Sequence, residues 1–396
     1  MTSEFGKNRY NRYGQPSLDL VFTGSKKSLK SRVGNQQVEF TRDSVGTYID
    51  ENGIIQTANV NDPRFDHDPV TGESLGLLIE EERTNFFLKS QPIDADWSQY
   101  NGSTITDNQA TGPDGVANSA SLVAFPATGG SIPIIGESTP GASGTVTVSA
   151  YVRAVTNTAS IQIGTNVSYS ASQIVGTSWT RIIFTTSVVG TSAGLRSGDV
   201  NNAQNFYIFG AQIESGSFPT SYIPTTSSAV TRAADVASIE GTNFSSWFNP
   251  DASTVYYEGN VIADASGNYA LFALAQQSGA RQGSFMLTRR SNLGGRFTHY
   301  DSNDVRDIDL NSALWVDNSY RKLATAIGQS SAAFADSGSL VGTDTTYQRP
   351  SASDGLGQLL LGRGVGGGIS AYNVHVSRLT YWPTRLPDSD LQELTQ

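Results

Sequence analysis

Short runs of alternating apolar and polar residues, each ended by Gly, Asn, Ser or Pro, recur along this chain of 396 residues. Alternation with a period of two places the apolar residues on one face of a β-strand. Within residues 145–153 the residues on one such face are Val146, Val148, Ala150 and Val152. Long stretches with the helical period are hard to find. The pattern therefore predicts an all-β chain whose sheets each bury one face.

The predicted strands form two groups. The first group comprises residues 145–153, 160–163, 179–186 and 205–214. The second group comprises residues 254–260, 269–275, 284–288, 295–300, 321–327, 358–362 and 370–382. Turn residues separate these runs at intervals that suit a β-sandwich or jelly roll. A helix is predicted at residues 387–394, with Asp388 or Ser389 as its N-terminal cap.

Composition along the chain indicates three regions, at residues 1–90, 91–234 and 235–396. The main boundary follows residues 216–234, which contain two Pro and many Ser and Thr without periodicity, as a linker or an extended strap would. Before residue 90 the strand-like pieces, 18–22, 37–42 and 47–49, are short and separated by polar loops. We therefore expect an extended N-terminal region that folds against something else, followed by two β-sandwich or jelly-roll domains.

Charge and cysteine content exclude several classes of function. The chain has 26 Lys and Arg against 36 Asp and Glu, a net charge of −10, whereas nucleic acid is held by a surplus of positive charge. We expect no nucleic-acid partner. The absence of Cys excludes disulfides, cysteine zinc sites and thiol catalysis. No apolar segment follows the basic N-terminus and no apolar run approaches roughly 18 residues, so we expect no secretory signal and no membrane insertion.

Residues 38–90 (VEFTRDSVGTYIDENGIIQTANVNDPRFDHDPVTGESLGLLIEEERTNFFLKS) resemble a segment shared by many structural proteins of tailed phages. Residues 209–234 resemble the close of the sandwich that follows it in those proteins. Residues 235–396 resemble a concanavalin-like, laminin-G-type jelly roll that ends in a strand and a helix. The matching positions that we interpret as a particle-docking motif are Arg42, Arg64, Phe65, Glu80, Arg83 and Asn85.

This resemblance implies a virion component, either a tail or head fibre or a capsid decoration. The implied partners are other virion proteins, of the capsid, portal, tail or baseplate, and further copies of the chain in a homotrimer, since phage fibres are often trimeric. The implied location is the virion. Because phages lyse their host, a virion protein needs no signal peptide. From the residues themselves, Arg42, Arg64 and Arg83 have acidic neighbours that would supply paired charges, either fixing this segment or lying as separate solvated pairs.

Two short motifs match catalytic or nucleotide-binding patterns, but their surroundings argue against both. Residues 190–194 (GTSAG) match a nucleophile elbow, yet no helix is predicted after them, so we expect a turn. Residues 362–367 (GRGVGG) match a dinucleotide loop, yet a predicted strand follows, so we expect a flexible hairpin. The spaced carboxylates of concanavalin-like glycosidases are missing, and the adjacent Glu80, Glu81 and Glu82 cannot all converge on one substrate. We predict that the protein is not an enzyme.

The sequence predicts no metal ion and no cofactor. His67, His299 and His375 are not spaced as ligands of one metal ion. Residues 301–306 begin like a calcium loop, but Val305 and Arg306 stand where a ligand and a Gly are needed. Calcium held by scattered side chains stays open as an alternative, and its candidate ligands are Asp301, Asp304, Asp307 and Asp309.

Aromatic residues indicate where a glycan would bind. Sugar rings stack on aromatic side chains and their hydroxyls pair with Asn, Asp and Arg, so a glycan site needs both kinds of residue together. Residues 97–101 (WSQYN) and 296–304 (RFTHYDSND) have this mixture. The candidate carbohydrate-binding residues are Trp97, Tyr100, Arg296, His299, Tyr300 and Asp301.

The leading hypothesis is a non-enzymatic phage virion structural protein of the fibre type. Its N-terminal region would dock on the particle, and its lectin-like sandwiches would bind host-surface glycans. Display of many copies would make a weak single-site affinity useful. Two alternatives remain. One is a capsid or tail decoration or cement protein without a glycan site, and the other is a tailspike-like polysaccharide hydrolase.

Overall fold

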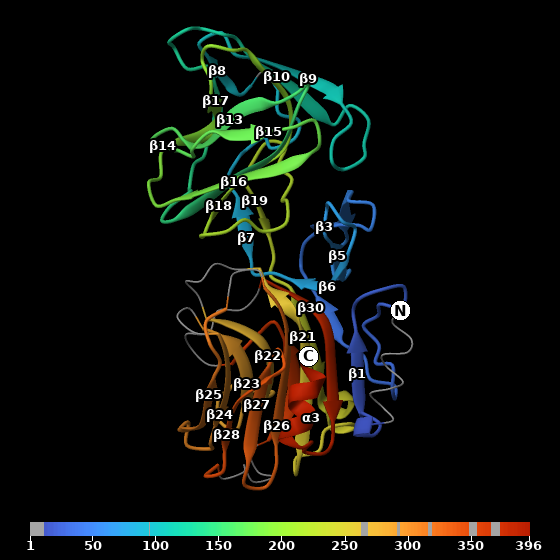
Figure 1. Ribbon diagram of the computed structural model, residues 1–396. Coiled ribbons are helices and arrows are strands. Elements are labelled where there is room, and N and C mark those ends of the chain that lie inside the picture. The colour runs from blue at the N-terminus through green and yellow to red at the C-terminus, as the bar shows by residue number, and fades with distance from the viewer. Residues whose placement is uncertain are drawn as a thin grey trace. The chain divides into compact units, whose positions relative to one another are not determined.

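The computed structural model describes residues 12–94, 96–262, 268–290, 294–315, 319–347, 355–365 and 373–396. Strands make up 48% of the structure and helices 4%, which confirms the predicted all-β class. The chain forms two compact units (Figure 1). Unit 1 contains Met1–Arg42, Val60–Glu81 and Ala234–Gln396, and unit 2 contains Asp43–Asn59 and Glu82–Ala233. Among the described residues, no helix has the length and apolar composition needed to cross a membrane.

Unit 1 is a sandwich of two antiparallel sheets. The eight-stranded sheet has the order β28 (Ser339–Asp344), β27 (Ala332–Asp336), β26 (Tyr320–Ile327), β21 (Ser253–Val261), β30 (Val374–Trp382), β6 (Ser74–Ile79) and β5 (Arg64–His67), with β1 (Leu18–Val21) also paired to β30. The seven-stranded sheet has the order β2 (Glu39–Thr41), β20 (Val236–Glu240), β29 (Leu356–Leu361), β22 (Tyr269–Gln276), β23 (Phe285–Arg289), β24 (Gly295–Tyr300) and β25 (Arg306–Asn311). Between the sheets, the rings of Tyr257 and Phe272 lie with centres 6.4 Å apart.

Helices α2 and α3 lie in the described part of unit 1. Helix α3 (Asp388–Leu394) packs Leu391 and Leu394 against small side chains of β26 and β27, and Figure 1 shows it beside these strands. Its N-cap is Pro387, without a side-chain hydrogen bond, so the prediction of Asp388 or Ser389 as the cap is wrong. Helix α2 (Gly241–Ser245) was not predicted, because a single turn leaves too few residues for a periodic pattern.

Unit 2 is a second sandwich. Its five-stranded sheet has the order β16 (Thr180–Thr186), β12 (Val146–Ala154), β18 (Gln204–Ser215), β10 (Ala120–Phe125) and β9 (Thr104–Ala110). Its six-stranded sheet has the order β14 (Ser168–Tyr169), β13 (Ala159–Thr165), β17 (Ser192–Ser197), β11 (Ile134–Ser138) and β8 (Ser98–Tyr100), with β15 (Gln173–Val175) also paired to β13. Two small sheets join β7 (Arg83–Asn85) to β19 (Val230–Arg232) and β3 (Gly46–Ile49) to β4 (Ile55–Ala58).

The core of unit 2 lies between its two large sheets. The predicted apolar face of β12 is fully inside it, since its four residues are at most 1% exposed: Val146, Val148, Ala150 and Val152. Ile161 of β13 and Leu195 of β17 meet them from the other sheet. The opposite face of the six-stranded sheet is thereby left as an outer surface.

The first ninety residues contribute strands to both units. The predicted pieces 18–22, 37–42 and 47–49 are β1, β2 and β3. In unit 1, β1 and β6 pair with β30, and β2 pairs with β20. In unit 2, β7 pairs with β19. The described part of this region thus completes sheets made by later residues, and the boundaries at residues 90 and 234 stay a prediction.

Two predicted turns have different outcomes. Residues 190–194 were expected to form a turn, but Ser192 begins strand β17, so this prediction is wrong. In the glycine-rich segment 362–367, Gly362 follows β29 with a φ of 62°, while residues 366 and 367 lie outside the described residues. The start of the predicted strand 370–382 lies outside them as well, and β30 forms the remainder.

Candidate functional site

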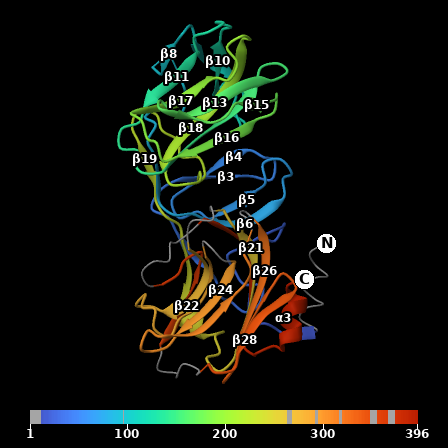
Figure 2. The ribbon, with the colours of Figure 1, turned by 60° about the vertical axis from the view of Figure 1, so that its left-hand side comes forward.

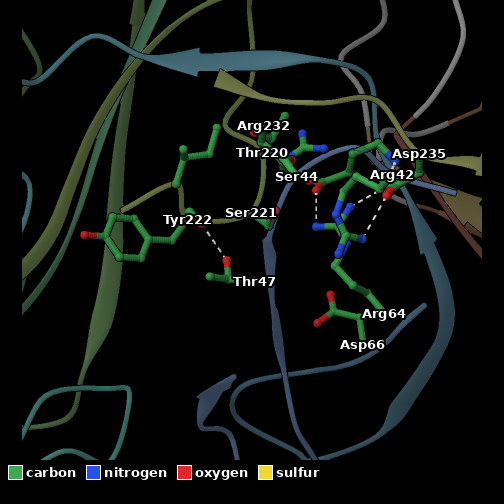
Figure 3. Close-up of polar contacts among 12 residues, drawn as sticks. Arg42, Ser44, Thr47, Arg64, Asp66, Thr220, Ser221, Tyr222, Arg232 and Asp235 are labelled. Carbon is green, nitrogen blue, oxygen red and sulfur yellow. Dashed lines mark hydrogen bonds and ion pairs between the residues drawn. The ribbon is translucent and has the colours of Figure 1, made fainter. Parts of the chain in front are cut away.

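Three residues of the predicted docking motif form a buried charged cluster in unit 1. Figure 3 shows two of them, Arg42 and Arg64, beside Asp235. Arg42 donates from Nη1 to Oδ1 of Asp235 at 3.2 Å and to the carbonyl oxygen of Asp62 at 3.1 Å. Arg64 donates from Nη1 to Oε2 of Glu80 at 2.7 Å and from Nη2 to Oδ2 of Asp235. The backbone N–H of Glu80 also donates to Oδ2 of Asp235, at 2.7 Å. We call Arg42, Arg64, Glu80 and Asp235 the arginine cluster.

The arginine cluster holds the three segments of unit 1 together. Arg42 follows β2, Arg64 begins β5, Glu80 follows β6 and Asp235 precedes β20, so each segment supplies at least one member. The four residues are at most 3% exposed, and two positive charges face two negative ones. Burial alone would lower the pKa of Arg64, but Asp235 and Glu80 raise it above its ordinary value. Such a balanced, hydrogen-bonded set is the condition under which charges are tolerated inside a protein.

The remaining motif residues also have structural partners. In unit 2 the buried Asn85 amide donates to the carbonyl oxygens of Ala211 and Ile223, and its oxygen accepts from the N–H groups of Phe87 and Ile213. The guanidinium of Arg83 lies 4.9 Å from the centre of the Phe218 ring.

Phe65, on β5 in unit 1, is half-buried, and the Lys27 ammonium lies 6.0 Å from the centre of its ring. The side chains of Arg42, Arg64, Glu80 and Asn85 are buried and paired inside the chain, and the role of this motif in particle docking stays a prediction.

A groove of about 560 Å³ crosses the outer face of the six-stranded sheet of unit 2. Figure 2 shows four of its strands, β8, β11, β17 and β13, beside one another. Because Ile135, Ala193 and Leu195 point into the core, their neighbours along β11 and β17 face outward. The groove is lined by Ser98, Tyr100, Asn101, Ile134, Gly136, Glu137, Ser138, Asn166, Tyr169, Thr191, Ser192, Ala193 and Arg196.

The register of the strands arranges these residues in three rows across the sheet. One wall of the groove is the row Tyr100, Ile134, Arg196 and Gln162. The floor is the row Ser98, Gly136, Gly194, Gly164 and Tyr169. The other wall is the row Ser138, Ser192 and Asn166.

Three consecutive positions of the floor row are glycines, namely Gly136, Gly194 and Gly164. A Cβ at Gly194 would lie 2.1 Å from the carbonyl oxygen of Ile135, so a side chain there requires the backbone to shift. Glycine within a strand often marks a place where a ligand or another backbone approaches closely. Of these three glycines Gly136 lines the groove, whereas Gly164 and Gly194 are buried.

Tyr169 closes one end of the floor and is held by Arg196. The guanidinium of Arg196 lies 4.1 Å from the centre of the Tyr169 ring, and its Nε donates to Oε1 of Gln162 at 2.6 Å. Burial raises the pKa of the Tyr169 hydroxyl, while the charge of Arg196 opposes that shift. Tyr169 is thus a fixed aromatic surface with a neutral hydroxyl.

The remaining polar groups of the groove point toward solvent. Among the described residues, the side-chain hydroxyls of Ser98, Tyr100 and Ser138 make no hydrogen bond within the chain, and Tyr100 is 54% exposed. The carboxylate of Glu137 accepts the Lys89 backbone N–H at 3.1 and 3.2 Å, and burial raises its pKa. A ligand would find hydroxyl donors and acceptors beside aromatic rings, which is the combination that sugars require.

The groove contains one of the two predicted residues of segment 97–101. Tyr100 lines it, whereas Trp97 is 1% exposed, stacks on Phe87 with ring centres 5.0 Å apart, and donates its indole N–H to the carbonyl oxygen of Lys89. The prediction that Trp97 contacts a sugar is corrected, because its ring lies in the core. Asn101, Asn166, Tyr169 and Arg196 were not predicted as site residues, since their proximity depends on strand pairing.

The second predicted glycan segment lies at the edge of the seven-stranded sheet of unit 1. Arg296 is 6% exposed and forms a two-bond ion pair with Asp309, which also accepts a hydrogen bond from Arg306 at 2.6 Å. Tyr300 is 8% exposed, and the guanidinium of Arg281 lies 4.3 Å from its ring centre. Both side chains are therefore engaged by partners within unit 1.

His299 and Asp301 have internal roles in the same segment. His299 is fully buried, lies 4.3 Å from Phe285 between ring centres and contacts Asp307 through Nδ1, so its prediction as a sugar contact is corrected. Asp301 accepts the backbone N–H groups of Asn303 and Val305 at 2.9 and 2.8 Å, which lower its pKa and fix its loop.

The four candidate calcium ligands have separate partners. Asp304 pairs with Arg281, Asp307 with His299 and Asp309 with Arg296, while Asp301 closes its own loop. The described residues contain no group of three or more acidic, His or Cys side chains arranged to hold a metal ion.

The GTSAG segment lies along the groove. Strand β17 begins within it, at Ser192, whereas a nucleophile elbow needs a strand that turns into a helix. Ser192 faces the groove from this strand. The segment therefore contributes to the wall and floor of the groove and does not form the elbow of a hydrolase.

Comparisons with known proteins return distant similarities among solved structures. No protein-family model matches the sequence, and no curated protein matches it.

The carbohydrate-binding module CBM40 of a Ruminococcus gnavus sialidase, bound to α2,6-sialyllactose, is 16% identical with a TM-score of 0.33, covering 39% of this chain and 88% of that one. The receptor-binding domain of a botulinum neurotoxin C/D mosaic serotype is 11% identical with a TM-score of 0.33, covering 41% of this chain and 40% of that one. A Trypanosoma rangeli sialidase is 14% identical with a TM-score of 0.32, covering 40% and 25%. Similarities at this level carry no functional argument, so the argument rests on the groove itself.

Proposed function

We propose that this chain is a non-enzymatic, glycan-binding structural protein of a phage particle, and that the groove of unit 2 is its glycan-binding site. The groove is the observation that carries the proposal. It combines two tyrosine rings with solvent-facing hydroxyl and amide groups within one cavity. Binding rather than hydrolysis is proposed because the three His of the chain lie in unit 1 and Ser192 has no helix behind it.

The virion role rests on the resemblance of residues 38–90 to the shared phage segment. The structure gives this segment a folding role, since Arg42, Arg64 and Glu80 hold unit 1 together and Asn85 fixes unit 2. Because this segment is needed for the fold of both sandwiches, proteins at different places on a particle could share it for its folding role. Display of many copies would raise the effective affinity of a shallow groove.

The test of glycan binding is an array of bacterial and animal glycans probed with the full chain. We expect binding to a subset of glycans, and we expect Ser98→Trp, which places a large ring over the floor, to weaken it at least tenfold. Ser178→Trp is the matched control, because Ser178 is exposed and does not line the groove. Silence across the array, or unchanged binding by Ser98→Trp, would show that the groove is not a glycan site.

The virion role is tested on purified particles of the phage that encodes the chain. Antibodies raised against the recombinant protein should label intact particles, and mass spectrometry should detect the chain in them. Absence of the chain from the particles would overturn this half of the proposal while leaving the glycan measurement valid.

A further inference from the structure

We propose that the groove binds an internal stretch of an extended, uncharged oligosaccharide, with Tyr100 and Tyr169 as two separate stacking surfaces. This inference rests on the proposed glycan-binding function and specifies the class of glycan. It follows from the spacing of the two rings, the open edges of the sheet and the charge of the groove.

The spacing of the tyrosines requires a ligand longer than one sugar. Tyr100 lies on β8 and Tyr169 on β14, the first and last strands in the order β14-β13-β17-β11-β8. Four interstrand steps of about 4.8 Å place these strands about 19 Å apart. One sugar ring cannot contact both tyrosines, so a ligand that uses both must be a chain laid across the strands.

The floor between the tyrosines suits such a chain. Gly136, Gly194 and Gly164 are neighbours in register on β11, β17 and β13. Gly136 lines the groove between the tyrosines, and Ser138, Ser192 and Asn166 offer hydroxyl and amide groups along one side of it. A sugar chain that follows this side can therefore pair its own hydroxyls with those groups.

The ends of the groove indicate binding within a chain rather than at its terminus. Strands β8 and β14 end the pairing order of the sheet on either side, so the path between them leads out at two edges. A pocket for a terminal sugar would need a closed end with polar groups around the last ring. The lining residues instead follow the sheet from one edge strand to the other.

The charge of the groove favours neutral sugars. Its charged lining residues are Arg196 and Glu137, which together carry no net charge when both are ionised. Arg196 is engaged by the ring of Tyr169 and the amide of Gln162, whereas acidic sugars are usually held by arginine pairs aimed at a carboxylate.

The test measures affinity of the full chain for size series of linear neutral glycans. The probes are cello-, malto-, chito- and galacto-oligosaccharides of one to six sugars, printed with the wider array, and sialyllactose and oligogalacturonate as acidic probes. We expect affinity for the bound series to rise at least tenfold from the disaccharide to the hexasaccharide, with weak binding of acidic probes.

Two tyrosine variants locate the effect. Tyr100→Ala and Tyr169→Ala should each weaken binding of the hexasaccharide about tenfold, since each removes one stacking surface. A disaccharide reaches one tyrosine, so at most one of the variants should weaken its binding. Tyr320→Ala is the matched control, because Tyr320 is 51% exposed and lies in unit 1.

The outcomes separate this inference from the proposed function. Equal affinity for a monosaccharide and a hexasaccharide, or preference for sialyllactose or oligogalacturonate, would overturn the inference and leave glycan binding standing. Loss of disaccharide binding in both tyrosine variants would overturn the two-surface arrangement. Silence of the whole array would overturn the proposed function, and the inference with it.

Discussion

The arginine cluster of unit 1 and the groove of unit 2 both gather charged and polar side chains, but they use them in opposite ways. In the cluster, two guanidinium groups and two carboxylates are buried and satisfy one another. In the groove, hydroxyls such as those of Ser98 and Ser138 face solvent, and the aromatic ring of Tyr100 is half exposed. Polar groups that are already paired support the fold, whereas groups left facing a cavity are available to a ligand.

The largest effect is expected from Asp235→Ala. This change removes the carboxylate that Arg42 and Arg64 share, and so takes a counter-charge away from two buried guanidinium groups. Breaking a buried ion pair on one side costs about 3–5 kcal/mol. Urea unfolding should show this loss, while Glu39→Ala, at an exposed position of β2, should stay within about 0.5 kcal/mol. A stability loss no larger than that of Glu39→Ala would mean that the cluster does not hold unit 1 together.

Asn85→Ala should have the next largest effect, in unit 2. Its amide makes four hydrogen bonds to the backbone, so the change leaves buried N–H and C=O groups unpaired. We expect a loss of about 1–3 kcal/mol in the free energy of unfolding. Asn205→Ala, at an exposed position of β18, is the control. If Asn85→Ala leaves the free energy of unfolding unchanged, the side chain of Asn85 is not needed for the fold and becomes a candidate docking contact.

Arg196→Ala should separate binding from stability. The guanidinium contributes a contact with the Tyr169 ring, worth about 0.5–1 kcal/mol at a partly exposed site, so unfolding should change little. Glycan affinity should fall severalfold, because Tyr169 loses the contact that fixes its ring. Calorimetry on the bound glycan and urea unfolding of the same variant check the two parts. A large loss of stability would mean that Arg196 supports the fold, as the arginine cluster does, and does not serve the groove.

The strands were predictable wherever apolar residues alternate. The buried face of β12 could be read from the sequence because Val146, Val148, Ala150 and Val152 recur at every second position. Strands β25 (RDIDLN) and β28 (SLVGTD) were missed, since they lie at sheet edges where little apolar surface is buried. Strands β10 (ASLVAF) and β27 (AAFAD) were also missed although most of their residues are buried, because their apolar residues run together and do not alternate clearly.

The candidate sites were less predictable, because they depend on pairing between distant residues. Arg64 could be recognised as a candidate for charge pairing, but Asp235 lies 171 residues away along the chain. Trp97 and Tyr100 are three positions apart in one polar segment, and nothing in that segment shows that the first ring points inward and the second outward. The floor glycines likewise meet through the register of β11, β17 and β13.

The smallest effect concerns Asp309, whose environment lies between those of the cluster and the groove. Burial tends to raise its pKa, but hydrogen bonds from Arg296, Arg306 and Asn311 hold the pKa well below its ordinary value. In the unfolded chain the pKa of Asp309 is near 3.8. At pH values above 3.8 the ionised carboxylate therefore stabilises the folded state, and this contribution is lost as the pH falls below that value. Because the side chain is 37% exposed, we expect less than about 1 kcal/mol. Urea unfolding from pH 6 to pH 2.5 should show a smaller loss of stability for Asp309→Asn than for the native chain. If the native chain and Asp309→Asn lose equal stability, solvent screens this ion pair completely. The guanidinium of Arg296 would then be available to a ligand, as the hydroxyls of the groove are.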